Sequence, residues 1–207
     1  MVARPMTDNW QQDDDPWVVT GLTCPFENSW FRIDAHEVIH PDGAPGTYSV
    51  IRIRRLAVGV LPIDPDGHVH LVGQWRFALG RYSWEMPEGG AEPGEAASEC
   101  AKRELAEETG LRAGRLQLIL EMDLSNSLTD ECAVVFLATD LAPGESTPES
   151  TEVLARRRAP FAEVLARVVD GRIRDAMTVA AVLRAHHMAI TGELPEPLAQ
   201  AMLAPGV

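Results

Sequence analysis

The chain has 207 residues, of which 18 are basic and 31 are acidic, so its formal net charge is −13. This length suits one domain, or one domain with a small appendage, and 45% hydrophobic residues are enough for a real core. The negative charge argues against a broad nucleic-acid-binding surface, which needs a basic face, and against docking on anionic membranes.

The cysteines and the apolar runs indicate a cytoplasmic protein. Cys24, Cys100 and Cys132 fit neither zinc nor redox spacings, and an odd number fits poorly with a closed disulfide framework. The N-terminal residues are polar and acidic, unlike a signal peptide, and no apolar run reaches the length of about 18 residues that a membrane span needs. We therefore expect reduced thiols and no membrane segment.

The N-terminal third predicts strands. Residues 1–16 are polar and contain an Asp run, which is typical of a flexible acidic tail. Residues 17–57 show partial alternation around Pro/Gly turns and predict a β-hairpin or meander. Two further strands are expected over residues 56–63 and 68–73, and the sequence Asp-Pro-Asp-Gly at 64–67 predicts a hairpin turn between them.

One helix is expected in the middle of the chain. Proline suits a first helical turn, so Pro93 predicts its beginning, and Glu95 would favour the helix N-terminus. Ala97, Ala101 and Leu105 form an i,i+4 row for its buried side. Gly110 is a natural left-handed end.

The remaining segments complete an α/β pattern. Strands are expected over residues 116–122, 133–138 and 151–156, and helices over residues 161–170 and 175–189. We assign residues 58–191 to the main domain and expect the Pro-rich residues 192–207 to form a loosely packed tail. The order of strands, helix, strands and helices predicts an α/β sandwich with helices flanking a mixed sheet.

The expected helix carries three carboxylates on one stripe. Glu104, Glu107 and Glu108 fall within an arc of about 100° when each residue turns by about 100°. Like charges at this spacing repel each other and destabilise an isolated helix, and a bound divalent cation would offset that cost. Oxygen ligands without His or Cys suit Mg²⁺ or Mn²⁺.

The segment around this stripe resembles the Nudix box. It fits Gly-x5-Glu-x7-Arg-Glu-U-x-Glu-Glu-x-Gly-U, where U is a bulky apolar residue, at Gly89, Glu95, Arg103, Glu104, Leu105, Glu107, Glu108, Gly110 and Leu111. The strand order around the box also resembles the Nudix α/β/α sandwich. The resemblance implies a Mg²⁺-dependent hydrolase of a nucleoside diphosphate linked to another group.

The resemblance also implies site residues in and next to the box. Glu104 and Glu108 would be the foremost metal ligands, joined by Glu107, which we also count among the catalytic residues. The backbone carbonyl of Glu88 would be a further ligand. Arg103 would pair with the acidic cluster and orient it.

Flanking residues resemble the ADP-ribose pyrophosphatase and nucleoside-diphosphate-sugar hydrolase branch. They are the tripeptide Gln74-Trp75-Arg76 and residues 84–90, which lead into the box. By this resemblance Arg76 would contact a substrate phosphate or the terminal sugar, and Glu85 would touch the substrate or lie at the sheet edge. Arg76 and Gln74 are each balanced between substrate contact and sheet-edge packing.

Two other expectations rest on the same resemblance. The general base would come from a loop after the box, where Glu149 and Glu152 are the candidates, with Glu152 slightly favoured because it abuts a strand. The branch is typically a homodimer whose N-terminal strands help to build the partner's site. Trp30 and Phe31 are candidates to stack on the nucleotide base, although Trp30 also suits a core or interface anchor.

Three functional hypotheses follow. The first is hydrolysis of ADP-ribose or a related nucleoside diphosphate sugar to a nucleoside monophosphate and a sugar phosphate. Residues 124–131 lack a proline that is frequent in the ADP-ribose branch, which leaves a broader range of sugar nucleotides open. The second is hydrolysis of dinucleoside polyphosphates or nucleoside triphosphates, and the third is a non-catalytic nucleotide-sugar sensor.

Overall fold

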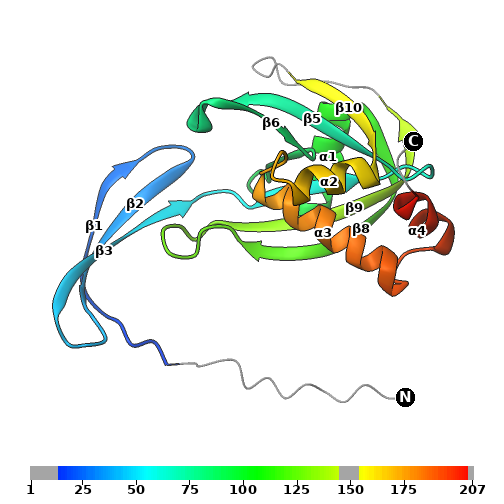
Figure 1. Ribbon diagram of the computed structural model, residues 1–207. Coiled ribbons are helices and arrows are strands. Elements are labelled where there is room, and N and C mark those ends of the chain that lie inside the picture. Colours follow the sequence, from blue (N-terminus) through cyan, green and yellow to red (C-terminus); the bar gives the residue numbers. More distant parts are fainter. Residues whose placement is uncertain (1–13, 145–153, 205–207) are drawn as a thin grey trace. The chain divides into compact units, whose positions relative to one another are not determined.

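The computed structural model describes residues 14–144 and 154–204 (Figure 1). The chain divides into two compact units, Met1–Arg52 and Ile53–Val207. Within the described ranges, no helix is long and apolar enough to cross a membrane. Cys24, Cys100 and Cys132 are free thiols, and only Cys100 is buried.

The N-terminal unit is built on a three-stranded sheet. Its strands are β1 (Val18–Glu27), β2 (Phe31–Ile39) and β3 (Pro45–Ile53), in the order β1-β2-β3. The β1–β2 turn is held by the Asn28 side chain, whose Oδ1 accepts hydrogen bonds from the backbone N–H of Trp30 and Phe31, each at 2.8 Å. The predicted meander is confirmed.

The second unit contains a mixed four-stranded sheet. Its strands are β4 (Ala57–Pro62), β7 (Glu88–Gly90), β8 (Leu111–Asp123) and β9 (Cys132–Pro143), in the order β7-β4-β9-β8. β4 and β9 run parallel, whereas β7 pairs with β4 and β8 pairs with β9 in antiparallel fashion. A mixed sheet is the architecture that the sequence predicts.

Helices cover both faces of this sheet because apolar residues occur at successive positions of its strands. Val58 and Val60 of β4 belong to a core cluster with Leu105 of α1 (Ala97–Thr109). Leu61 belongs to a second cluster, which also contains Met177 of α3 (Ala176–Thr191). Figure 1 shows α3 crossing the strands β8 and β9. A strand that is buried on both faces has a continuous apolar sequence, as β4 does.

A second sheet of three antiparallel strands carries part of the site. β10 (Ala155–Pro160), β5 (His68–Arg76) and β6 (Arg81–Glu85) pair in the order β10-β5-β6, and the short helix η1 (Phe77–Leu79) joins β5 to β6. The predicted hairpin between residues 56–63 and 68–73 is confined to its turn and to one antiparallel bridge, between Ile63 and Val69. The turn forms, with Gly67 N–H bonded to the Asp64 carbonyl at 2.9 Å, but β4 and β5 belong to different sheets.

The C-terminal segment is helical. After α2 (Phe161–Val169) and α3, the chain forms α4 (Glu196–Leu203), so the predicted loose tail over residues 192–207 is wrong for its described part. Leu194, Ala199 and Met202 are buried in the main core cluster. The proline content was misleading because Pro195 stands just before this helix and Pro197 lies in its first turn, where a proline is tolerated.

The boundaries of several elements differ from the prediction, and the strands predicted over residues 116–122 and 133–138 are longer, as β8 and β9. α1 begins at Ala97 rather than near Pro93, because the preceding residues form a turn in which Glu95 N–H bonds the Glu92 carbonyl at 2.9 Å. The strand predicted over residues 151–156 appears as β10, which begins at Ala155.

Candidate active site

The acidic stripe of α1 faces the edge of the mixed sheet. Glu108 is only 3% exposed, and its Oε2 accepts a hydrogen bond from the backbone N–H of Glu88 on β7 at 3.1 Å. The Glu104 carboxylate lies so close to Gly89 that a Cβ built on that glycine would be 2.0 Å from Glu104 Oε1. The carboxylates of Glu104 and Glu108 therefore both lie against the backbone of β7.

Arg103 connects five partners around this stripe, one of which is the Cys100 sulfur, 3.4 Å from Nη2. Its Nη1 donates to Glu104 Oε1 at 2.7 Å and to Glu107 Oε2 at 3.1 Å. Its Nε and Nη2 donate to the Glu95 carboxylate at 2.9 and 3.0 Å, and Nη2 also reaches the Gly90 carbonyl at 3.4 Å. The hydrogen bonds from Arg103 lower the pKa of Glu95 to about 2. Sequence reasoning placed Glu95 at a helix terminus, whereas its carboxylate is a partner of Arg103.

A second charged cluster lies on the other side of β7. Arg76, the last residue of β5, donates from Nη2 to Glu85 Oε2 at 2.5 Å and to Glu88 Oε1 at 2.9 Å, and its Nε lies 2.9 Å from the same Glu85 oxygen. Asp175 completes the cluster, because carboxylate oxygens of Glu85, Glu88 and Asp175 all lie within 4.8 Å of one another. Three acidic groups thus surround one guanidinium.

Glu88 is the least satisfied member of this cluster. Its Oε2 is buried and has no hydrogen-bond partner in the described part of the chain. Burial, followed by the nearby carboxylates of Asp175 and Glu85, holds the pKa of Glu88 well above its usual range. The donor set around β7 consists of carboxylate and backbone oxygens, which fits Mg²⁺ or Mn²⁺ and does not fit a thiophilic metal.

The N-terminus of α3 ties this cluster to the sheet. Asp175 caps α3 by accepting a hydrogen bond from Thr178 N–H at 2.7 Å. The Thr178 hydroxyl, in turn, accepts a hydrogen bond from the backbone N–H of Met86 at 2.9 Å. Sequence reasoning missed Asp175, and the available signal, an Asp at the start of a predicted helix, indicates only a cap.

The C-terminal end of α1 is held by β10. Arg156 Nε donates a hydrogen bond to the Glu108 backbone carbonyl at 2.5 Å. Carbonyls at a helix C-terminus lack intrahelical partners, so a cation is favourable here. Arg156 therefore anchors the residue whose side chain reaches β7.

The other predicted site residues lie on β5, in the N-terminal unit, or outside the described residues. Gln74 lies on β5 opposite Ser83 of β6 and two positions before Arg76, so both side chains project from the same face of the strand. Trp30 is 63% exposed and belongs to the N-terminal unit. Glu149 and Glu152 lie outside the described residues.

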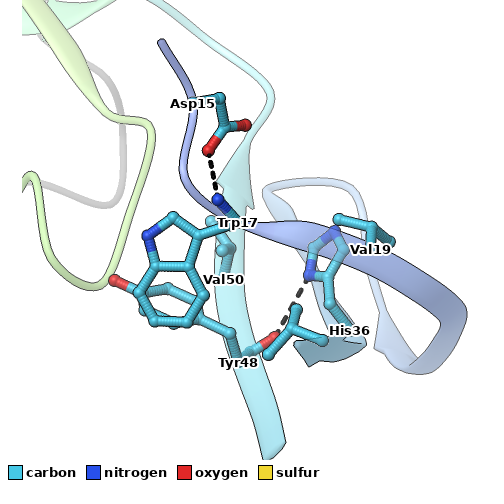
Figure 2. A pocket seen from close by; sticks show the side chains of 7 residues that line it. Asp15, Trp17, Val19, His36, Tyr48 and Val50 are labelled. Atoms are coloured by element: carbon cyan, nitrogen blue, oxygen red, sulfur yellow. Dashed lines mark hydrogen bonds between the residues drawn. The ribbon is translucent and has the colours of Figure 1, made fainter. Parts of the chain in front are cut away.

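The N-terminal unit contains a small aromatic pocket that the sequence did not reveal (Figure 2). Its volume is about 240 Å³, and Trp17, His36 and Tyr48 are among the residues that line it. The ring of Trp17 meets that of Tyr48 edge-on at a centroid distance of 5.4 Å, and His36 Nδ1 lies 3.1 Å from the Tyr48 carbonyl. The pocket is defined within this unit alone.

Comparison with known proteins agrees with this geometry. The NUDIX domain model matches residues 53–184, and the chain belongs to the Nudix family. The chain is 33% identical over 172 residues to the ADP-ribose pyrophosphatase of Mycobacterium tuberculosis (strain ATCC 25618 / H37Rv), covering 81% of this chain and 82% of that protein. It is 28% identical to the ADP compounds hydrolase NudE of Escherichia coli (strain K12), covering 73% of this chain and 82% of that protein.

A solved structure described as an ADP compounds hydrolase has the same fold. The TM-score between the two structures is 0.79, the sequences are 22% identical, and the alignment covers 89% of this chain and 100% of that chain. Together with the complete box, the family match and the relatives identify the chain as a Nudix pyrophosphohydrolase.

Proposed function

We propose that this enzyme hydrolyses the pyrophosphate bond of ADP-ribose or a related nucleoside diphosphate sugar in a Mg²⁺-dependent reaction. The observation that carries the proposal is the placement of the Glu104 and Glu108 carboxylates against the backbone of β7. The similarity to the ADP-ribose pyrophosphatase of M. tuberculosis supports the choice of substrate class. Water would add across the P–O–P linkage of ADP-ribose and give AMP and ribose 5-phosphate.

Residues of α1 and β7 would hold the metal. Glu104, Glu108 and Glu107, with the backbone carbonyl of Glu88, would bind Mg²⁺, and Mn²⁺ offers the same oxygen preference. A bound ion would neutralise charge on the phosphate oxygens and lower the pKa of an attacking water. Arg103 would keep the carboxylates of Glu104 and Glu107 in place through its bonds at 2.7 and 3.1 Å.

The remaining roles are proposals from the sequence. Glu149 or Glu152 would accept the proton of the attacking water, a step that contributes about 10²–10⁴-fold to rate. Gln74 and Glu85 would border the substrate. The three free cysteines are compatible with the cytoplasmic location that we propose.

A homodimer is also part of the proposal. The N-terminal sheet exposes several large apolar side chains, including Val18, Val19, Leu22, Phe26 and Trp30. Four of these side chains lie along β1, and exposed apolar residues on one strand would suit a protein–protein contact. Light scattering coupled to size exclusion tests the assembly, and a molar mass near 22.6 kDa would contradict it. Trp30 would then stack on the base of a bound nucleotide.

The proposed activity is tested by product analysis. With Mg²⁺, the protein should convert ADP-ribose to AMP and ribose 5-phosphate, and a panel with GDP-mannose, a dinucleoside polyphosphate and a nucleoside triphosphate should show weaker turnover of the last two. Glu108→Gln should lower kcat by at least about tenfold. Glu99→Gln is the matched control, because Glu99 lies on the same helix with a side chain that is 63% exposed.

Two results would contradict the proposal. Unchanged turnover in Glu108→Gln would contradict the assignment of Glu108 as a metal ligand. Tight binding of ADP-ribose without cleavage in the presence of Mg²⁺ would favour a sensor.

A further inference from the structure

The end of α1 draws its hydrogen-bond partners from two sources. Within the helix, Gly110 N–H donates to the Ala106 carbonyl at 2.9 Å. The Glu108 carbonyl is bonded instead by Nε of Arg156, the second residue of β10, at 2.5 Å. Carbonyls in the last turn of a helix lack intrahelical partners, and a cation beside them is favourable. Arg156 therefore satisfies one of these carbonyls at the very residue whose carboxylate reaches β7.

Strand pairing places Arg156 on the face of the antiparallel sheet that carries predicted site residues. Arg156 lies opposite Val72 of β5, and Val72 lies opposite Glu85 of β6. Residues directly opposite each other in antiparallel strands project from the same face, and so do residues an even number of positions apart on one strand. Arg156 therefore shares a face with Glu85 and, by way of β5, with Arg76.

Glu108 is thereby held by both sheets of the second unit. Its Oε2 accepts a hydrogen bond from Glu88 N–H of β7 at 3.1 Å, and its carbonyl accepts the bond from Arg156 of β10. β7 belongs to the mixed sheet, whereas β10 belongs to the three-stranded antiparallel sheet. The first bond fixes the side chain of Glu108 and the second fixes its main chain. A shift of the end of α1 would consequently move the Glu108 carboxylate relative to β7.

We infer that Arg156 is a positioning residue of the proposed metal site and acts through the main chain of Glu108. Its hydrogen bond fixes the last turn of α1, and that turn sets where the Glu108 carboxylate meets β7. The inference rests on the proposed function only in that α1 binds a divalent cation. It makes the affinity for that cation depend on a residue of β10, in the sheet that also carries Arg76 and Glu85.

Mn²⁺ binding without nucleotide tests this inference, with free Mn²⁺ measured by electron paramagnetic resonance. Arg156→Gln removes a positive charge near the proposed cation site, so the Coulomb interaction alone would lower the Kd for Mn²⁺. Loss of positioning has the opposite effect, and we expect the Kd to rise about tenfold. Arg156 is an exposed residue, so this substitution leaves no cavity in the core.

The matched control is Arg157→Gln, which makes the same change one residue further along β10. Arg157 projects from the opposite face of the sheet and donates to Glu163 Oε1 of α2 at 3.1 Å. The Arg157 side chain is 45% exposed, and exposed ion pairs contribute little, so the Kd for Mn²⁺ should stay within about twofold of wild type. Urea denaturation of both variants measures any loss of folding stability separately from the affinity for Mn²⁺.

A conservative variant should rescue the site. Arg156→Lys keeps a cation that can donate to the Glu108 carbonyl at the helix C-terminus, so its Kd for Mn²⁺ should stay within about threefold of wild type. At saturating Mn²⁺, kcat and the KM for ADP-ribose in Arg156→Gln should both return to within about twofold of wild type, because the metal site is then filled. Arg156→Met, a second neutral variant, repeats the Mn²⁺ titration if Arg156→Gln does not fold.

The outcomes separate the inference from the proposed function. A Kd for Mn²⁺ that is unchanged or lower in Arg156→Gln would overturn the inference, and a raised KM for ADP-ribose at saturating Mn²⁺ would then make Arg156 a substrate contact. Equal rises of the Kd in Arg156→Gln and Arg157→Gln would also overturn it, because the effect would then belong to β10 as a whole. If the wild-type protein binds Mn²⁺ but cleaves no sugar nucleotide, the proposed function fails while the Mn²⁺ titrations still decide the role of Arg156.

Discussion

Replacement of Gly89 by alanine should disable the proposed metal site with little damage to the fold. Gly89 does not have a positive φ, so the backbone accepts alanine and the effect is steric. The new Cβ would lie 2.0 Å from Glu104 Oε1 and 2.3 Å from its Cδ. Favourable contacts lie at about 3.5 Å, so the carboxylate has to move by more than about 1 Å. Its 2.7 Å bond to Arg103 would then break or rearrange.

Two measurements quantify this change. Overpacking of this kind costs about 1–3 kcal/mol in the free energy of unfolding, measurable by urea denaturation. The Kd for Mn²⁺ should rise about 10–100-fold, because a displaced ligand weakens the site. Gly90→Ala is the control, since a Cβ there would meet the exposed side chain of Arg55 at 3.0 Å. Mn²⁺ affinity in Gly89→Ala equal to that in Gly90→Ala would refute the reasoning.

Three further predictions concern stability and reactivity. Met202→Ala should lower the free energy of unfolding by about 2–5 kcal/mol, because the Met202 side chain is only 1% exposed. The control Leu203→Ala, at a residue that is 43% exposed, should lower it by less than about 1 kcal/mol. Equal urea midpoints for the two variants would contradict the packing of α4. In the native protein Cys100 should resist a thiol reagent while the two exposed cysteines react, because burial raises the pKa of Cys100 to about 12. Reaction of all three thiols would disprove this. The pKa of Glu95 in the folded protein is about 2, below its ordinary value of 4.5. The difference in unfolding free energy between wild type and Glu95→Gln should therefore be constant above about pH 4.5 and shrink as the pH falls towards about 2. A difference that does not depend on pH would argue against the ion pair of Glu95 with Arg103.

The helix of the active site was the most predictable part of the fold, because its signals are local. The spacing of Glu104 and Glu108 sets their stripe on any α-helix, and Gly110 ends the helix with φ of 75°, as expected. The start was misplaced because Pro93 suits a turn as well as a first helical residue. The orientation of the Glu95 side chain is set by its hydrogen bond with Arg103, eight residues further along the chain.

Pairing between strands could not be read from turns alone. The Asp64–Gly67 turn forms as expected, yet β4 pairs with β7 and β9 while β5 pairs with β6 and β10. The Asp64 carboxylate accepts bonds from the backbone N–H of His68 at 3.1 Å and from Arg158 Nε at 2.6 Å. These contacts, one of them from a distant strand, stabilise a corner between two sheets, and no short-range pattern distinguishes such a corner from a hairpin.

Three of the four members of the second charged cluster were predicted, and the fourth was missed for the same reason. Arg76, Glu85 and Glu88 stand near the box in sequence and were recognised as site residues. Asp175 joins them only because α3 packs against the sheet, so its place depends on the tertiary fold. The burial that raises the pKa of Glu88 is likewise a property of packing and has no sequence signature.

The bond between Thr178 and Met86 has a consequence for the order of assembly during synthesis. The two residues are 92 positions apart, so a chain leaving the ribosome presents α1 before α3 has been synthesised. Synthesis proceeds at about 5–20 residues per second, and a domain generally folds as a unit. The backbone beside Glu88 therefore lacks its second support for several seconds, and a nascent chain that ends before α3 carries the acidic helix without a completed catalytic centre.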